Sequence, residues 1–316
     1  MSRRRRGAAV SGWINLDKPP GMTSTQATSR ARRLLDAQKA GHAGTLDPLA
    51  TGVLPIALGE ATKTVPFLVD AGKAYRFTIE WGRSTDTCDS EGETIALSAV
   101  RPSPEDAARA LEGFVGEIMQ VPPAFSAVKV DGQRAYDLAR RGVELELQAR
   151  PVVIHAARVA SAPDADHIEI EIECGKGTYV RSLARDLSAG LGACGHVSQL
   201  RRTRVGPFQE ADAISVETLE DFCNRGAGLE ALLPVETALD DIPALAMTQE
   251  DAFRLSQGRA VVLLPRQVET LEARLQSRSI GDRDVSRTVL ATDQGRALAL
   301  CEMRAGRLQP LRLFHL

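Results

Sequence analysis

One carboxylate, Asp47, lies in a segment punctuated by glycine and proline, and it is the first candidate for chemistry in this chain. The segment, from Ala40 to Gly52, reads AGHAGTLDPLATG. Its glycines allow backbone conformations and close approaches that other residues resist, and Pro48 keeps Asp47 out of the helical region. An Asp-Pro turn that caps a helix is the better explanation of the local pattern taken alone, and the rest of the chain reverses this preference. An acid held this firmly beside small residues, however, indicates a catalytic loop.

Three further features need a joint explanation with Asp47. Tyr75 lies between Lys73 and Arg76, Tyr179 is followed closely by Arg181, and residues 200–206 read LRRTRVG. The sequence contains no P-loop, dinucleotide-binding glycine motif, HExxH zinc motif or GxSxG nucleophile motif, and its five histidines lack ligand spacing. A lone acid, a guanidinium, phenols and basic segments together favour chemistry on a nucleic acid, with no cofactor and no metal.

The net charge of −2 conceals a strong asymmetry along the chain. Residues 1–65 carry ten basic against four acidic side chains, and residues 174–206 carry six against one. Residues 209–256 carry eleven acidic against two basic side chains. The two basic blocks could form one surface for a polyanion, with the acidic block facing elsewhere; solvated faces are the alternative.

Composition and length bound the class of protein. The chain has 316 residues, of which 43% are hydrophobic, and its five cysteines show no C-x-x-C spacing. These values predict two domains in a reducing compartment, without disulfides or structural zinc. No apolar run approaches the roughly 18 residues of a membrane span, and the basic start lacks the apolar core of a signal peptide. We therefore expect a cytoplasmic protein that does not contact membranes.

The elements that must position these residues follow from local patterns, and they predict an α+β fold with a mostly antiparallel mixed sheet flanked by helices. The predicted strands cover residues 13–16, 53–58, 73–81, 125–130, 152–160, 167–174 and 197–208, and the predicted helices begin at Thr23 or Ser24, at Ser103 and after Thr178. A helix is also expected from Glu60 to Asp70. The predicted organisation is a basic arm (residues 1–11), a catalytic domain (12–245) and a small β-rich domain (246–316), with an arginine-rich polar stretch at 266–287.

The chain resembles the TruB family of tRNA pseudouridine synthases. The matching blocks are LDKP with the following TS at 16–24, GHAGTLDPLATGVLP at 41–55, GEATK at 59–63, YR at 75–76, KGTYVR at 176–181 and LRR at 200–202. The resemblance implies that the chain converts uridine 55 in the T-loop of tRNA to pseudouridine. It also implies tRNA, through its T-arm, as partner, no cofactor or metal, no obligate protein partner, a monomer, and a PUA-like C-terminal domain that extends the RNA contact.

The resemblance also implies roles for individual residues. Asp47 matches the family nucleophile, which attacks either C1′ of the ribose or C6 of the base, and Arg181 would pair with it. Tyr75 would stack on the target base and assist proton removal. The other implied roles are His42 in the space vacated by the flipped base, Tyr179 and Leu200 around the base, Arg201, Arg202 and Arg204 on RNA phosphates, and residues 18–21 as a brace for the catalytic loop.

Two other functions fit the same residues. A synthase of this fold could act on another RNA, as guide-directed members do with partner proteins. A protein that binds or folds tRNA without catalysis is the second alternative, and the presence of Asp47, Tyr75 and Arg181 argues against it.

Overall fold

The computed structural model describes residues 7–126, 128–130, 132–143, 146–280 and 283–316. Its larger part is built on one sheet, which has nine strands in the described residues and the main order β1-β3-β12-β4-β11-β10-β7. Short strands β2 and β13 extend this sheet beside β3 and β12. Every pair is antiparallel except β12 with β3. The strands are β1 (Gly12–Lys18), β2 (Ala40–His42), β3 (Thr51–Leu58), β4 (Lys73–Trp81), β7 (Gly116–Gln120), β10 (Arg150–Ser161), β11 (His167–Cys174), β12 (Gly195–Val205) and β13 (Phe208–Gln209).

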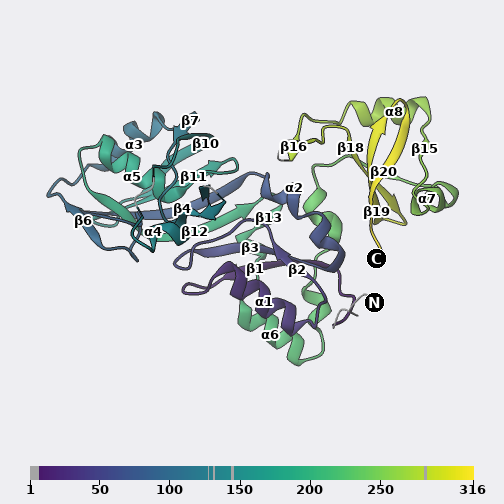
Figure 1. Cartoon of the computed structure of the whole chain (residues 1–316), viewed down its shortest axis with the longest axis horizontal. Helices are drawn as coiled ribbons and strands as arrows, with labels where there is room; N and C mark the ends of the chain where they lie inside the picture. Colours follow the sequence, from purple (N-terminus) through teal and green to yellow (C-terminus); the bar gives the residue numbers. More distant parts are fainter. Residues whose placement is uncertain (1–6, 127, 131, 144–145, 281–282) are drawn as a thin grey trace.

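Helices flank this sheet in two groups, as Figure 1 shows. Helices α1 (Ser24–Leu34) and α6 (Val216–Asn224) pack together beside β1 and β3, while α3 (Pro104–Glu112) and α5 (Val180–Gly190) pack against β10, β4 and β12. The predicted helix starts are confirmed. Thr23 caps α1 in a reciprocal pair with Gln26, and the Ser103 side chain accepts from the backbone N–H of Asp106.

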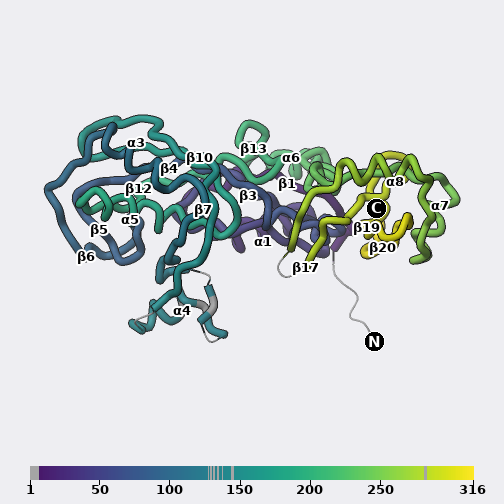
Figure 2. Tube along the Cα trace, turned by 90° about the horizontal axis from the view of Figure 1, so that it is seen from above, coloured from purple at the N-terminus to yellow at the C-terminus, as the bar shows by residue number. Residues whose placement is uncertain are grey.

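The remaining elements of the larger part are short. They are η1 (Gly59–Lys63), α2 (Val65–Val69), β5 (Arg83–Thr85), β6 (Thr94–Leu97), β8 (Lys129–Val130), β9 (Gln133–Arg134), α4 (Ala135–Ala139), η2 (Glu210–Asp212), η3 (Gly228–Ala231) and η4 (Val235–Leu239). Seen from above, the segment around α4 projects away from the sheet (Figure 2).

Three of the predicted elements differ from the structure. The single strand expected at 197–208 ends at Val205, where the chain reverses and pairs β13 antiparallel with β12. The single helix expected from Glu60 to Asp70 is wrong, because a 3₁₀ turn ends at Lys63 and a new α-helix begins at Val65. Pro66 lacks a backbone N–H and is tolerated only in a first helical turn, so it forces the restart. The strand expected at 125–130 shrinks to Lys129–Val130, and residues 127 and 131 lie outside the described part.

The C-terminal part is small and rich in strands, as predicted. Its sheet has the order β14-β18-β19-β20-β15 and surrounds a core of its own that includes Leu255, Val289 and Met303. The elements are β14 (Ala244–Ala246), α7 (Gln249–Ser256), β15 (Val261–Val262), α8 (Pro265–Glu272), β16 (Ser279–Ile280), β17 (Arg283–Asp284), β18 (Thr288–Asp293), β19 (Arg296–Arg304) and β20 (Arg307–Leu313). The arginine-rich stretch thus forms α8 and the β16–β17 pair.

A hydrophobic seam joins the two parts. Trp13 and Phe208 of the larger part belong to one buried cluster with Leu290, Leu300 and Phe314 of the smaller part. Two hydrogen bonds between side chains and backbone also join the two parts. The Lys63 ammonium donates to the carbonyl of Leu313 at 2.7 Å, and the His315 N–H donates to the Glu60 carboxylate at 2.9 Å. The small part is therefore docked, and does not hang on a free linker. No helix in the described residues is both long and apolar enough to cross a membrane.

Candidate active site

The loop that carries Asp47 connects β2 to β3 and is tied down by the N-terminal segment of the chain. The Ser24 hydroxyl donates to the carbonyl of Leu46 at 3.1 Å and accepts from its N–H at 2.8 Å. The N–H of Gly21 donates to the carbonyl of Pro48 at 2.8 Å. These bonds on both sides of Asp47 hold its backbone in one conformation.

Lys18 is the strongest of these anchors. Its fully buried ammonium donates to the carbonyls of Pro19 (2.9 Å), Met22 (2.7 Å) and Pro48 (3.2 Å). Burial lowers the pKa of Lys18 to about 8, against the opposing attraction of Asp47. The prediction that this segment braces the catalytic loop is confirmed for Lys18 and Gly21.

Arg202 anchors the loop from the opposite side. Its guanidinium donates to the carbonyls of Val53 at 2.7 Å and Gly44 at 3.2 Å, and Arg202 as a whole is 1% exposed. Gly52 lets the strands approach, because a Cβ there would lie 2.2 Å from the Arg202 carbonyl oxygen. Its burial and its bonds to backbone carbonyls argue against the predicted contact of Arg202 with RNA phosphates. Neighbouring side chains of a strand point to opposite faces, and on β12 Arg202 is buried while Arg201 is half-buried.

Asp47 and Arg181 meet as predicted. The Arg181 Nε lies 2.9 Å from a carboxylate oxygen of Asp47, although its N–H does not point along that line, so the contact is an ion pair. The Asp47 side chain is 35% exposed and the Arg181 side chain 5%. Arg181 is itself fixed, because its two terminal nitrogens donate to the carbonyls of Thr87 and Phe125, both at 2.9 Å.

Asp89 is a functional candidate that the sequence reasoning missed. Its carboxylate lies 3.5 Å from Arg181 Nη1, and the residue is 3% exposed. It also accepts from the Thr87 hydroxyl at 2.6 Å and the Glu91 N–H at 3.1 Å. In sequence Asp89 sits in a polar stretch that is typical of a solvated loop, so no local signal separates it from its neighbours.

A cavity of about 450 Å³ opens beside this ion pair. Six of the predicted site residues line it: Asp47, Tyr75, Tyr179, Arg181, Leu200 and Arg202. The Tyr75 phenol is buried, which raises its pKa, while a hydrogen bond with Arg202 acts in the opposite direction. The backbone of Tyr179 is clamped by the buried Gln120 amide, which accepts from its N–H at 2.8 Å and donates to its carbonyl at 3.2 Å.

Three predicted site residues lie outside this cavity lining. His42 sits half-buried on β2 opposite Ile56, and burial lowers its pKa. Arg201 forms a two-pronged pair with Asp17 (3.0 and 2.9 Å) and bonds Glu210 at 2.8 Å. Arg204 pairs with Glu173 at 2.6 Å. Phosphates would have to compete with these carboxylates, and contact with RNA stays a prediction for both arginines.

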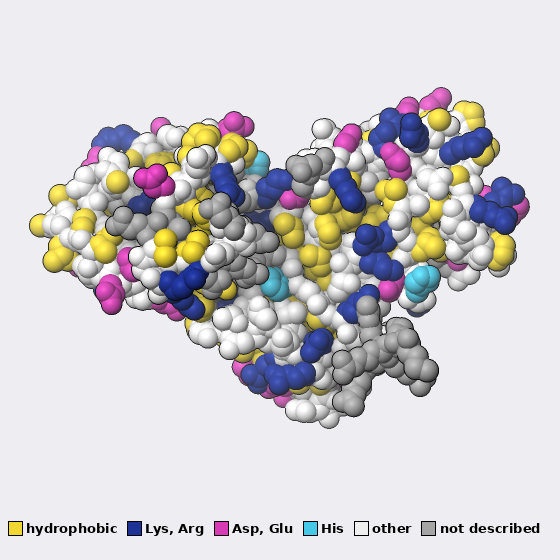
Figure 3. Space-filling view, viewed as in Figure 1, with side chains coloured by type: hydrophobic (Ala, Val, Ile, Leu, Met, Phe, Trp, Pro, Cys, Tyr) yellow, Lys and Arg dark blue, Asp and Glu magenta, His cyan; other side chains and the backbone are white. Residues whose placement is uncertain are grey.

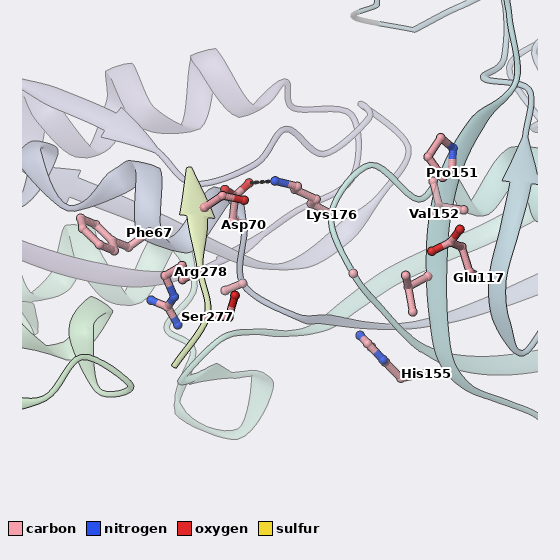
Figure 4. Close-up of a pocket in the computed structure, with 13 residues that line it drawn as sticks. Phe67, Asp70, Glu117, Pro151, Val152, His155, Lys176, Ser277 and Arg278 are labelled. Atoms are coloured by element: carbon pink, nitrogen blue, oxygen red, sulfur yellow. Dashed lines mark ion pairs between the residues drawn. The ribbon is translucent and has the colours of Figure 1, made fainter. Parts of the chain in front are cut away.

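A second cavity, of about 500 Å³, adjoins the Asp47 pocket (Figure 4). The two share Asp70, Gly175 and Lys176, and the Lys176 ammonium lies 3.2 Å from the Asp70 carboxylate at their common border. Residues 277–279 of the small part also line this cavity, and Arg278, which lies near Asp70 in Figure 4, is paired with Asp241. The Asp47 pocket therefore leads into a cleft between the two parts of the molecule.

The site combines a fixed carboxylate, its arginine and a buried phenol around a cavity of about 450 Å³, an arrangement that suits nucleophilic attack followed by proton transfer. Across the residues that the structure describes, no three His, Cys, Asp or Glu side chains gather so that they could hold a metal ion.

Comparisons with known proteins point to one family. Residues 32–180 match the TruB family pseudouridylate synthase N-terminal domain, and residues 181–240 match the tRNA pseudouridylate synthase B C-terminal domain. Proteins named tRNA pseudouridine synthase B from Caulobacter sp. strain K31 and Caulobacter vibrioides are 67% and 65% identical over the full length of both chains.

Two solved structures contain chains with the same fold. A Cbf5-Nop10-Gar1 complex contains a chain that matches with a TM-score of 0.69 and 25% identity, covering 96% of this chain and 85% of that one. A chain of an H/ACA RNP bound to a substrate RNA containing 2′-deoxyuridine shares the fold, with a TM-score of 0.71, 22% identity and coverage of 100% and 92%. On the full-length identity and the two domain matches together, this chain belongs to the TruB family of pseudouridylate synthases.

Proposed function

We propose that this protein isomerises uridine 55 in the T-loop of tRNA to pseudouridine, with Asp47 as the nucleophile. The relatives' shared name, tRNA pseudouridine synthase B, supports the reaction and the class of substrate. The observation that carries the residue assignment is the Asp47–Arg181 contact of 2.9 Å at the wall of a 450 Å³ cavity that Tyr75 also lines.

The reaction breaks the N1–C1′ bond, turns the uracil and joins C5 to C1′. The Asp47 carboxylate either attacks C1′, so that the N1–C1′ electron pair leaves with the uracil, or attacks C6, so that the C5=C6 π pair moves onto O4. Both routes place negative charge on the base. C5 then bonds to C1′ and displaces Asp47 from it, or, in the C6 route, Asp47 is eliminated when the C5=C6 bond re-forms. The C5 proton leaves to a base, and we assign Tyr75 to assist this step.

The target base must leave the folded T-loop to reach Asp47. Tyr75, Tyr179 and Leu200 line the cavity that would receive it, and Tyr75 would stack on its face. His42 lies on β2, directly before the loop that carries Asp47, and we assign it to the space that the base vacates.

We assign residues 1–11 to a basic arm, 12–245 to the catalytic domain and 246–316 to a PUA-like module that extends the tRNA contact. A cleft of about 540 Å³ supports the last role, because Lys63, Arg283 and Arg312 line it where the two parts meet. In this region, Figure 3 shows Lys and Arg side chains beside a hydrophobic area. Its basic rim fits RNA phosphates. We propose that the protein acts as a monomer with no obligate protein partner.

Release of tritium from a T-arm hairpin with C5-labelled uridine tests the proposal. We expect release by the native enzyme, none by Asp47→Asn, and RNA affinity within about threefold, because asparagine keeps the shape but is no anionic nucleophile. Asp36→Asn is the matched control: this exposed aspartate has φ +48°, which asparagine tolerates.

Multiple turnovers by Asp47→Asn would refute the nucleophile assignment. If the native enzyme releases tritium from another RNA and none from the T-arm hairpin, the proposed substrate is wrong. Binding of tRNA without any release would favour the RNA-binding alternative.

A further inference from the structure

Two buried cations lie together at the floor of the Asp47 pocket. Lys73 is 8% exposed and Arg202 is 1% exposed, and both line the cavity. They converge under the start of the catalytic loop: a Cβ at Gly44 would lie 3.3 Å from Arg202 Nη1 and 3.6 Å from Lys73 Cε. The sequence reasoning gave Lys73 no role and placed Arg202 on the RNA backbone.

Neither cation forms an ion pair with an acidic side chain of the described residues. The Lys73 ammonium donates to the carbonyls of Val69 at 2.9 Å and Ala71 at 2.8 Å, which leaves one of its three N–H groups over. Arg202 uses part of its five-donor guanidinium on two carbonyls and on the Tyr75 phenol. Within the described part of the chain, neither side chain has a carboxylate within 4.0 Å, whereas Arg181 and Lys176 at the same pocket each do.

The floor of the pocket is therefore electropositive, and burying these two charges lowers the stability of the fold. Burial and, second to it, the positive charge of Arg202 lower the pKa of Lys73 to about 8. The other groups that face Lys73 are Cys174 and Asp70, which favour its charged form, and Lys176, which opposes it. Two neutral side chains at these positions would make the fold more stable than two buried charges without acidic partners. We therefore infer that the positive charge itself has a function.

We propose that Lys73 and Arg202 form a cationic floor that stabilises the negative charge developing on the uracil while its bond to the ribose is broken. This inference rests on the proposed function, and it holds for attack at C1′ or at C6, because both routes put the charge on the ring. Preorganised donors in a water-poor site are the most effective means of stabilising such charge.

The test measures the single-turnover rate at which the target nucleoside loses its N1–C1′ bond in two T-arm hairpins, one with uridine and one with 5-fluorouridine at the target position. Chromatography of the digested RNA gives this readout for both bases, because 5-fluorouridine has no C5 proton and cannot complete the last step. Fluorine withdraws electrons and stabilises the same negative charge, so it should partly replace the floor. We expect Lys73→Met to slow uridine about 100-fold and 5-fluorouridine about 10-fold. Lys73→Arg keeps the charge and should stay within about fivefold of the native rate on both.

Lys176→Met is the matched control, since it removes the same charge from the exposed rim of the same pocket. It should weaken RNA binding, lower the salt slope by about one and slow both bases by the same factor. If Lys73→Met destabilises the fold, Lys73→Gln keeps hydrogen-bond donors without the charge and should show the same dependence on the base.

Equal slowing of the two bases, or none, in a folded Lys73 variant would overturn the inference while leaving the proposed function intact. A native enzyme that converts neither hairpin would instead refute the proposed function itself. Normal rates with Lys73→Gln, together with slow conversion by Lys73→Arg, would show that packing matters and charge does not.

Discussion

Replacing Arg181 with methionine should destabilise the catalytic part as well as stop the reaction. The change removes the cation between two carboxylates, of which Asp89 is almost wholly buried and Asp47 is 35% exposed. It also takes donors from the carbonyls of Thr87 and Phe125. The substitution therefore leaves a buried negative charge without its partner.

The size of the effect follows from burial. Breaking a buried ion pair by removing one partner costs about 3–5 kcal/mol, and here that cost falls on Asp89. The Asp47 side adds little, because exposed pairs contribute about 0–1 kcal/mol. For a part of this size we expect the Tm to fall by on the order of 10 °C. The single-turnover rate should drop at least about 100-fold, because Asp47 loses the group that orients it.

A double variant separates stability from catalysis. In Arg181→Met with Asp89→Asn the buried charge is gone, while the amide oxygen can still accept from Thr87 and Glu91. We expect about 2–3 kcal/mol of the lost unfolding free energy to return, with no recovery of rate. Arg185→Met on the same helix is the control: its pair with Asp186 is more than a third exposed on the acid side, so its loss should cost less than about 1 kcal/mol.

Urea and thermal unfolding together with single-turnover assays provide both readouts. If the free energy of unfolding of Arg181→Met lies within about 1 kcal/mol of the native value, the charge of Asp89 must be compensated in another way, and the reasoning is wrong. A double variant no more stable than the single one would refute the same reasoning.

Two further predictions concern the loop and its pH dependence. Gly52→Ala should lower the free energy of unfolding by at least about 2 kcal/mol, because φ is +96° and the new Cβ would lie 2.2 Å from a backbone oxygen. Gly21→Ala, with φ +75° and open space around the new Cβ, should lower it less, as measured by urea unfolding. Equal losses for the two variants would contradict the role of the clash. The single-turnover rate should fall as pH rises past about 8, because the lowered pKa values of Lys18 and Lys73 leave both charged below that pH and neutral above it. A rate that stays level up to about pH 9.5 would contradict this assignment.

Local chemistry in the sequence was enough to predict many elements of the fold. Helix starts at Thr23 and Ser103 could be read because a capping side chain acts within four residues. The alternation of residues 73–81 predicted the buried strand that carries Tyr75, because strand periodicity is a local property. The glycine and proline pattern around Asp47 likewise indicated a constrained loop before any partner was known.

Contacts between distant segments were decided only in the tertiary structure. Adjacent arginines 201 and 202 look alike in sequence, yet one faces carboxylates at the surface and the other lies in the pocket floor. Neighbouring side chains of a strand point to opposite faces, and the sequence of a strand does not say what each face will meet.

The role of Asp89 likewise could not be predicted from the sequence. Nothing near it in sequence distinguishes it from a solvated loop acid, and its burial comes from a bridge between its loop and β12 and from the Arg181 side chain. The sequence by itself determined which residues carry reactive groups and which short segments are ordered. Which of those groups become buried, paired or left with unmatched charge depended on packing, because burial and charge pairing are properties of surroundings that distant segments supply.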